Sequence, residues 1–446
     1  MIRSVIRSGI ILMFSGIVII TGCATDYTRE MKPVTSDLRN DRPDLALQEF
    51  RETFQDSTGK NRLLYLMELG NLLRLTCYYT EAETVLLQAD RLSDQQRGVE
   101  LGQEIGAFLS SDLALDFRGA DYEKIFINYC LAASYAAEDN MEDALVECRA
   151  VNNKLRAFNL AYERNNRNRY SDDAFIRYLM GILFEKSGDL NNALIAYRNS
   201  AAVYDSSYAV EYGIPAPLRV KSDILRISNE LGMESVFQNY RNQWPEINDW
   251  QYQGPDASHG EIVVILEAGL IPPRVEKSYT FVFDDRIYKL ALPGIAAFKR
   301  NTLSVVLSSG NNQSIGFLAE DLAAIARKNL EDQAGRDIAR SIARLAVKAG
   351  VAEAGEQIVE ELTSENSTIS NITGFLLSLA GAATERADLR AWLTLPEQIY
   401  VARLTLPEGV QPLSVEVNGR IIFSDDAVSV TSGSINLYFL RENRPL

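Results

Sequence analysis

The residue types that most often carry out catalysis are scarce in this chain and follow no familiar pattern. Its one histidine, His259, lies among turn-forming residues. A serine or cysteine nucleophile needs a base beside it, and neither a GxSxG nor an HExxH frame is present. Glycine-rich phosphate loops and dinucleotide fingerprints are absent too. We therefore expect His259 to be an ordinary loop residue and expect no cofactor.

Adjacent aspartates are the other candidates for chemistry, at Asp172-Asp173, Asp284-Asp285 and Asp425-Asp426. Two carboxylates facing one cleft at a set separation can hydrolyse a glycan. Adjacent acids are better explained by helix capping and by solvated turns. We predict that the protein is not an enzyme and keep a carboxylate-dependent glycan hydrolase as an alternative.

The four cysteines show no CxxC or Cys/His spacing of the kind that binds a metal, so we predict no metal site. Cys77, Cys130 and Cys148 lie within helical patterns, where a small apolar residue would fit. Pairing of Cys130 with Cys148 in an oxidising compartment stays open.

The remaining cysteine, Cys23, ends a segment with the features of a signal peptide. Two arginines precede an apolar run from Gly9 to Ile20 that is too short to span a bilayer. The following Ile20-Thr21-Gly22-Cys23 resembles the lipobox of bacterial lipoproteins. That resemblance implies removal of residues 1–22 and lipidation of Cys23.

The residues after Cys23 indicate to which membrane the lipoprotein would be sorted. No aspartate of the kind that retains many lipoproteins in the inner membrane follows the cysteine. The resemblance therefore implies a lipid-anchored protein of the outer membrane, with its body in the periplasm; exposure at the cell surface stays open. Its first partner would be the lipid bilayer.

Composition and charge limit the other partners. The 446 residues are 46% hydrophobic and 24% charged, which is typical of globular domains and leaves room for two or three of them. Without residues 1–22, the chain has 43 basic and 60 acidic residues, a net charge of −17. Such a chain repels nucleic acid, so we predict no nucleic-acid partner.

The stretch from Leu63 to Ala89 predicts two amphipathic helices folded into a hairpin. It resembles the tetratricopeptide repeat (TPR), whose signature is a Leu-Gly pair, an aromatic residue, and then small, large and small residues on the second helix. In that resemblance the packing positions are Leu69, Gly70, Tyr79, Ala82, Leu86 and Ala89.

Further hairpins are predicted over residues 36–53, 122–151, 173–200 and 220–240. Small residues recur twelve positions apart within hairpins, at Gly70 and Ala82, Ala132 and Ala144, and Gly181 and Ala193. The hairpins do not form a uniform array, because Ala82, Ala144 and Ala193 are 62 and 49 residues apart instead of 34. We predict a tether over residues 23–35 and a TPR-like helical repeat domain over residues 36–242.

A basic patch lies within the insert at residues 157–170, where Arg164, Arg167 and Arg169 stand among four asparagines. It is either a solvated loop or a contact site for a carboxylate-bearing partner.

The second half of the chain predicts a β-rich domain over residues 261–446, after a linker at 243–260 rich in turn-formers and aromatic residues. Glu261 to Leu266 is typical of a buried strand, and further strands are predicted at 279–283, 286–290, 302–307, 398–406, 413–417, 420–423 and 434–440. Asn418-Gly419 predicts a type I′ hairpin. An alanine-rich helical insertion is predicted at about 318–390. The fold class is therefore multidomain α + β, a TPR-like solenoid followed by a β-rich domain with a helical insertion.

The whole chain resembles a family of TPR-containing bacterial outer-membrane lipoproteins with this order of parts, including the runs at Ala387 to Pro396 and Ala402 to Gly409. The resemblance supports the architecture and supplies no activity. We predict a membrane-tethered periplasmic scaffold or adaptor that binds one or more envelope proteins through its TPR-like groove, since such solenoids use their concave surface for binding. The alternatives are the glycan hydrolase and a regulator of peptidoglycan synthesis resembling the lipoprotein activators of penicillin-binding proteins.

Overall fold

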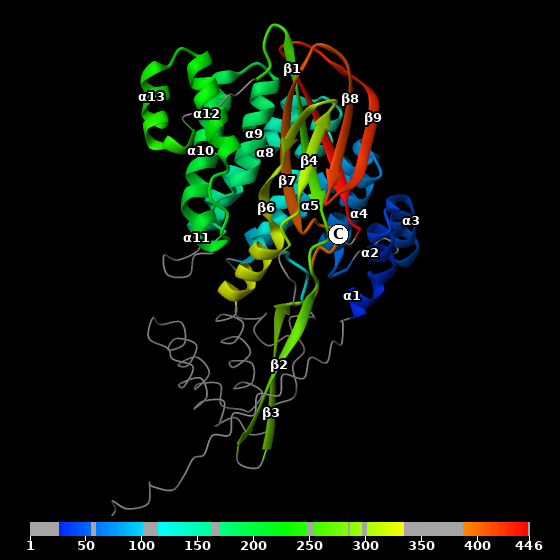
Figure 1. Cartoon of the computed structure of the whole chain (residues 1–446). Coiled ribbons are helices and arrows are strands. Elements are labelled where there is room, and N and C mark those ends of the chain that lie inside the picture. Colours follow the sequence, from blue (N-terminus) through cyan, green and yellow to red (C-terminus); the bar gives the residue numbers. More distant parts are fainter. Residues whose placement is uncertain are drawn as a thin grey trace, which may run out of the picture.

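The computed structural model describes residues 26–54, 59–100, 115–161, 170–247, 254–283, 286–296, 301–333 and 387–444. Helices occupy the first part of the chain, and strands occupy most of the described remainder (Figure 1). The predicted order, a TPR-like helical region followed by a β-rich region, is confirmed.

The described helical region is built mainly of five helical hairpins. The hairpins are α2 (Lys32–Arg39) with α3 (Pro43–Thr53), α4 (Arg62–Leu75) with α5 (Tyr79–Glu100), α7 (Asp121–Ala137) with α8 (Met141–Ala161), α9 (Ala174–Lys186) with α10 (Leu190–Val203), and α12 (Leu218–Glu230) with α13 (Glu234–Gln243). The short helix α1 (Asp26–Glu30) precedes them. A π-helical turn, η2 (Tyr204–Tyr208), and α11 (Ala209–Glu211) continue α10, and the 3-10 turn η3 (Pro245–Ile247) follows α13.

All five hairpins share one turn. The second residue after the first helix has a positive φ, between 57° and 77°, at Asp41, Cys77, Asp139, Gly188 and Gly232. The next N–H donates to the carbonyl five residues earlier, as in Tyr78 to Leu73 at 2.9 Å. This is the Schellman motif, which ends a helix and reverses the chain. In four hairpins a fully buried alanine follows the turn residue by five positions, at Ala46, Ala82, Ala144 and Ala193.

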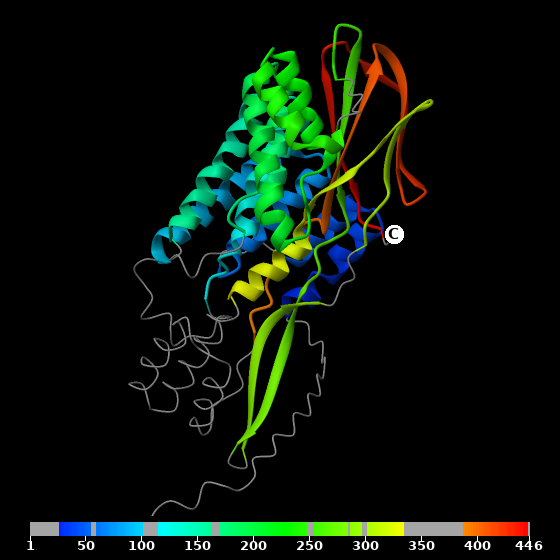
Figure 2. The same ribbon diagram turned by 60° about the vertical axis from the view of Figure 1, so that its left-hand side comes forward.

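The described strands form three sheets. The first has the order β10 (Ile435–Glu442), β1 (His259–Ala268), β7 (Gln398–Pro407) and β6 (Phe317–Asp321), and the second has the order β5 (Asn312–Ile315), β4 (Val305–Ser309), β8 (Gly409–Val417) and β9 (Arg420–Val430). The third is a hairpin of β2 (Arg274–Phe283) and β3 (Arg286–Ile295), which extends away from the rest of the molecule (Figures 1 and 2).

Strand β1 lies in the middle of the molecule, parallel to β10 and antiparallel to β7. Successive side chains of a strand point to opposite faces. Val263 and Ile265 belong to the core shared with the helices, whereas Ile262 and Val264 belong to the core between the two sheets. The body therefore has three layers, helices, first sheet and second sheet, and the prediction of a buried strand here is confirmed.

The turn between β8 and β9 is the predicted type I′ hairpin, with φ of 49° at Asn418 and 82° at Gly419. Strands β5 and β6 were not predicted, and residues 318–321, expected to start the helical insertion, belong to β6. Residues 322–333 are helical, and residues 334–386 of the expected insertion lie outside the described residues.

The tether predicted over residues 23–35 is wrong for its described part, because residues 26–30 form α1 and residues 32–35 begin α2. Tyr27, Met31 and Val34 are buried in the helical core. Their spacing of three and four residues is that of a helix face, which explains why this polar-looking segment folds onto the body. Within the described ranges, none of the helices has the length and apolarity needed to cross a membrane.

Candidate functional site

The concave side of the helical hairpins faces the first sheet. The first helices of the middle hairpins are buried around most of their circumference; in α7 every residue from Asp121 to Ser134 is buried. Val263 and Val401 of the sheet share one core with Leu72, Ile125 and Leu179 of the helices. The surface that the sequence predicts as a partner-binding groove is thus filled by the chain itself.

A part of the chain outside the helices and strands, residues 389–397 (the groove segment), also lies in this concave side. Glu68 accepts hydrogen bonds from the backbone N–H groups of Leu393, at 2.7 Å, and Thr394, at 3.1 Å. Asn71 donates to the carbonyl of Thr394 at 2.9 Å. Glu123 accepts from the N–H of Trp392 at 2.8 Å, and the Trp392 side chain is fully buried. Helix side chains therefore bind backbone groups of the segment, as a groove binds a peptide.

The carboxyl group of Glu68 is unusual among these contacts. Burial raises its pKa from 4.5 to about 7, although hydrogen bonds from Thr394 and Leu393 oppose the shift. The hydroxyl of Tyr27 in α1 also donates to this carboxyl group, at 3.0 Å. Glu68 therefore joins the first helix of the described chain to the groove segment.

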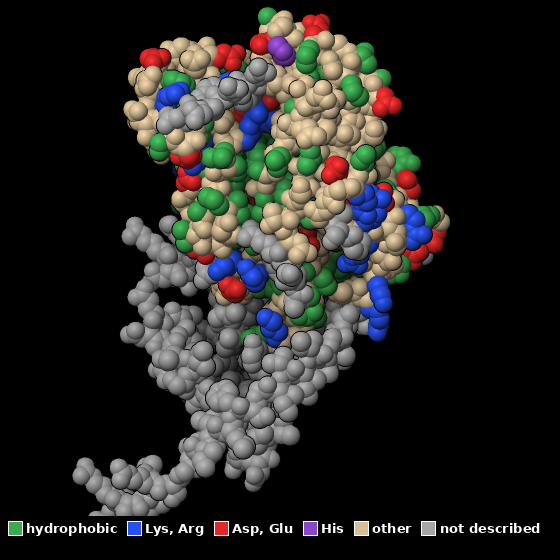
Figure 3. Space-filling view, in the orientation of Figure 1, with side chains coloured by type: hydrophobic (Ala, Val, Ile, Leu, Met, Phe, Trp, Pro, Cys, Tyr) green, Lys and Arg blue, Asp and Glu red, His purple; other side chains and the backbone are tan. Residues whose placement is uncertain are grey.

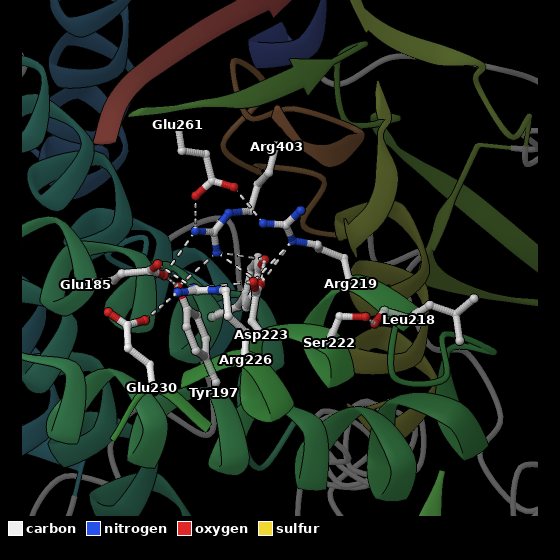
Figure 4. A network of polar contacts seen from close by, with 11 residues as sticks. Glu185, Tyr197, Leu218, Arg219, Ser222, Asp223, Arg226, Glu230, Glu261 and Arg403 are labelled. Atoms are coloured by element: carbon white, nitrogen blue, oxygen red, sulfur yellow. Dashed lines mark hydrogen bonds and ion pairs between the residues drawn. The ribbon is translucent and has the colours of Figure 1, made fainter. Parts of the chain in front are cut away.

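A cluster of charged residues centred on Arg403 of β7 lies between the first sheet and the helices (Figure 4). The Arg403 guanidinium lies 3.0 Å from a carboxylate oxygen of Glu185 in α9 and 3.0 Å from one of Asp223 in α12. It lies 2.5 Å from a carboxylate oxygen of Glu261 in β1. All four side chains are at most 2% exposed, so four elements meet at one buried guanidinium.

The buried members of the cluster are balanced in charge. Arg219 of α12 lies 2.6 Å from Glu261, and Arg226 of the same helix pairs with Glu185. Three carboxylates therefore face three guanidiniums. Burial alone would raise the pKa of Glu185, but Arg403 and Arg226 hold it at about 2. Since burying charge is costly unless it is paired, this balance is what makes the contact stable.

A second cluster centres on Glu267, at the other end of β1. Its carboxylate accepts hydrogen bonds from Arg74 of α4 at 2.8 Å, Arg441 of β10 at 2.7 Å and the hydroxyl of Tyr129 in α7 at 2.7 Å. Burial would raise the pKa of Glu267, and the two arginines bring it down to about 2. The two clusters hold the helices to β1 at both ends of the strand.

Within the described part of the chain, a third buried acid, Glu320 of β6, forms no ion pair. It accepts from the hydroxyl of Tyr208 at 3.1 Å, and burial together with the nearby Asp173 raises its pKa well above the ordinary value. The neighbouring Tyr204 hydroxyl donates to the carbonyl of Ala319 at 2.7 Å. Burial and a neighbouring acid both favour the neutral form of a carboxyl group.

The predicted TPR-like packing residues lie between paired helices. A Cβ atom at Gly70 would lie 2.6 Å from Leu86, and one at Gly181 would lie 2.3 Å from Tyr197, so neither position has room for a side chain without movement. The alanines of this set are buried, at Ala82, Ala89, Ala132, Ala144 and Ala193, and Leu69 packs partly buried against the same core.

Other predicted site residues fall elsewhere. Cys23 and the basic patch of Arg164, Arg167 and Arg169 lie outside the described residues. Cys130 and Cys148 are both buried free thiols, so this pair of described cysteines is not bridged.

His259 and Asp173, two residues considered as catalytic candidates, make hydrogen bonds that hold local structure. His259 begins β1, and its Nδ1 lies 2.9 Å from the Ser258 hydroxyl and 3.1 Å from Asp256. Both contacts use the same ring nitrogen, so they do not form a relay from acid through imidazole to serine. Asp173 caps α9 by accepting from the N–H of Ile176 at 2.6 Å.

One surface pocket of the described part lies beside α8, and its size can be compared with that of known ligand sites. A surface pocket of about 240 Å³ beside α8 is lined in part by Arg156, Asn159 and Asp172, and its volume is below the usual range of ligand sites. The described residues contain no group of histidine, cysteine and acidic side chains that could hold a metal ion.

Sequence reasoning missed the charged clusters. Glu261 and Glu267 flank the apolar run of β1 on the same face as Val263 and Ile265, and Arg403 opposes Val263 in β7. A charged residue on the inward face of a buried strand needs a buried partner. The glutamates within the apolar pattern of β1 were therefore the feature of the sequence that could have indicated a charged cluster.

Comparisons with known proteins add fold-level likenesses. No protein-family model matches the chain, and no curated protein matches it. Among solved structures, MamA from Desulfovibrio magneticus RS-1 is 14% identical with a TM-score of 0.31, covering 51% of this chain and 99% of that one. BtubC from P. vanneervenii is 15% identical with a TM-score of 0.32, covering 52% and 88%. A Rap protein complexed with Competence and Sporulation Factor is 12% identical with a TM-score of 0.30, covering 50% and 54%. The TPR-like character of this chain accordingly rests on its own hairpin geometry.

Proposed function

We propose that the protein is a membrane-tethered scaffold of the outer membrane that binds an envelope protein on the outer face of its second sheet. The proposal joins the lipidation expected at Cys23 to a body whose helices and first sheet share one core. Binding through the concave groove, as the sequence predicts, would require the first sheet and the groove segment to leave it. The second sheet, in contrast, turns one face away from that core.

A row of residues across the outer face of the second sheet carries this proposal. Ile315 pairs with Val306, Val306 with Glu416, and Glu416 with Ile421, so the row crosses all four strands in register. Ile315 is 78% exposed and Ile421 is 62% exposed. The solvated face of an antiparallel sheet is usually polar. Single exposed apolar residues are common, but three of the four residues in this row are apolar and only Glu416 interrupts them, which supports a protein contact.

Site-specific photocrosslinking in intact envelopes tests the proposal. A photoreactive amino acid is placed at Ile421 and, as a matched control, at Ile195 on the outer side of α10, which is 53% exposed. We expect a protein adduct from Ile421 and none from Ile195. Changing Ile315 to lysine should abolish the adduct formed at Ile421, because the two residues belong to one surface.

Two outcomes would contradict the proposal: no protein adduct at Ile421, or an adduct at Ile195 alone. The identity of an adduct at Ile421 would also separate the remaining alternatives. A peptidoglycan synthase in the adduct would make the scaffold a regulator of wall synthesis.

A further inference from the structure

We propose that the β2–β3 hairpin contacts the lipid bilayer to which the chain is tethered. This inference rests on the lipid anchor of the proposed function, and it concerns a surface other than the partner-binding face of the second sheet. It follows from the length of chain between Cys23 and the folded body, and from where the hairpin leaves that body.

The folded body begins almost directly after the anchor. Tyr27 is 8% exposed, its ring lies 5.7 Å from that of Phe54, and its hydroxyl bonds to Glu68. The chain is therefore fixed to the body from residue 27 onward. Tyr27 is the fourth residue after Cys23, and four steps from residue to residue span at most about 14 Å. An acylated Cys23 at the bilayer surface would hold the α1 end of the body within that distance.

The hairpin leaves the body at the same end. Glu68, which binds Tyr27, also binds the N–H of Leu393 in the groove segment. Two residues further, the carbonyl of Leu395 accepts from the N–H of Ile271 at 2.9 Å, and β2 begins three residues after Ile271. In both views the hairpin extends beyond α1, away from the helices and the two larger sheets (Figures 1 and 2).

The hairpin is longer than the tether. Its register is unbroken from Arg274 paired with Ile295 to Phe283 paired with Arg286, ten pairs in all. At about 3.3 Å per residue this ladder is about 30 Å long, roughly twice the reach of the tether. A projection of that length beside so short a tether reaches the bilayer surface when the body is held at its α1 end.

The amino-acid types in the hairpin suit such a contact. In the register, Tyr279 pairs with Leu290 and Phe281 pairs with Tyr288. Directly paired residues of an antiparallel ladder occupy the same face. Aromatic residue types are favoured at the membrane interface, where apolar and polar surroundings meet. Sequence and register thus place aromatic and aliphatic types together far from the base of the hairpin.

Depth-dependent quenching tests the inference on the full-length, acylated protein in vesicles of phosphatidylethanolamine and phosphatidylglycerol. With the exposed Cys77 changed to serine, Thr280→Cys carries an environment-sensitive fluorophore on the hairpin. The control is Asp256→Cys, a 57% exposed side chain beside His259 at the opposite end of β1. In Figure 3 the one histidine, coloured purple, lies at the top of the view, and in Figure 1, which has the same orientation, β2 and β3 lie at the bottom.

We expect quenching by nitroxide-labelled lipids to be severalfold stronger at Thr280 than at Asp256. Equal, weak quenching at both positions in protein that floats with the vesicles would overturn the membrane contact while leaving the anchor intact. Failure of the acylated protein to float would overturn the anchor itself, and the tethering in the proposed function with it.

Discussion

Replacement of Arg403 by methionine should destabilise the whole body, because it removes the central cation of a buried cluster while nearly preserving side-chain volume. Glu185, Asp223 and Glu261 would be left with two guanidiniums, those of Arg219 and Arg226. Breaking a buried ion pair from one side costs about 3–5 kcal/mol. The lowered pKa of Glu185, about 2 against an ordinary 4.5, has the direction expected when Arg403 and Arg226 outweigh the effect of burial.

The assay is urea unfolding of the chain from residue 24 onward, followed by far-UV circular dichroism and tryptophan fluorescence. The matched control is Arg42→Met, whose partner Asp37 lies 2.5 Å away in an exposed pair. Exposed pairs contribute about 1 kcal/mol or less. A loss for Arg403→Met no larger than that of the control would refute the reasoning.

The pH dependence adds a second measurement on the same variant. Because the folded-state pKa of Glu185 lies below its ordinary value, its contribution to stability is present above about pH 4.5 and is lost as the pH falls toward 2. The gap in unfolding free energy between wild type and Arg403→Met should therefore narrow over that window. A gap that stays constant there would contradict the electrostatic origin of the effect.

Three further predictions concern single side chains. Because the folded-state pKa of Glu68 is raised to about 7, the unfolding free energy of the wild type should fall by up to about 3 kcal/mol as the pH rises from 4.5 to 7. Glu68→Gln should lack this fall, and urea midpoints at pH 5 and pH 8 measure it in both proteins. The same pH dependence in wild type and variant would contradict the prediction. Gly181→Ala should cost about 1–3 kcal/mol because its Cβ would lie 2.3 Å from the Tyr197 ring, whereas Gly59→Ala, with nothing within 4 Å, should change stability by less than about 0.5 kcal/mol in the same urea assay. Cys77 should be the one described thiol that reacts rapidly with a thiol reagent in the native protein, as the other two are buried; loss of rapid labelling in Cys77→Ser is the check, and rapid labelling that persists would be the contrary result.

The helices and strands could be predicted from the sequence because the spacing of apolar residues follows from which faces of each element are buried. The small residues at Gly70 and Ala82 predicted a close hairpin, and the Asn418-Gly419 pair predicted a reverse turn through its need for positive φ. The turns of three hairpins were harder to locate in the sequence, because they place Asp41, Cys77 and Asp139, and not glycine, at positive φ.

The charged clusters could be predicted only in part. Glu261 and Glu267 lie in a buried strand, which indicates that each needs a buried partner of opposite charge. Those partners, such as Arg403 and Arg74, are far away in the sequence. A local pattern contains no information on which distant side chain will face a given carboxylate. The same applies to Glu68 and the groove segment, which are about 325 residues apart.

The sequence by itself determined the elements of this protein: helical hairpins, a buried β1, a type I′ turn and a lipobox-like Cys23. Those features depend on neighbouring residues and on the period of burial. Only the tertiary structure decided that the concave side of the hairpins is filled, because that depends on the inward face of the first sheet meeting it. Apolar side chains and paired charges of the hairpins and of the first sheet are buried together at this contact. The surface that we propose for binding a partner is therefore the outer face of the second sheet.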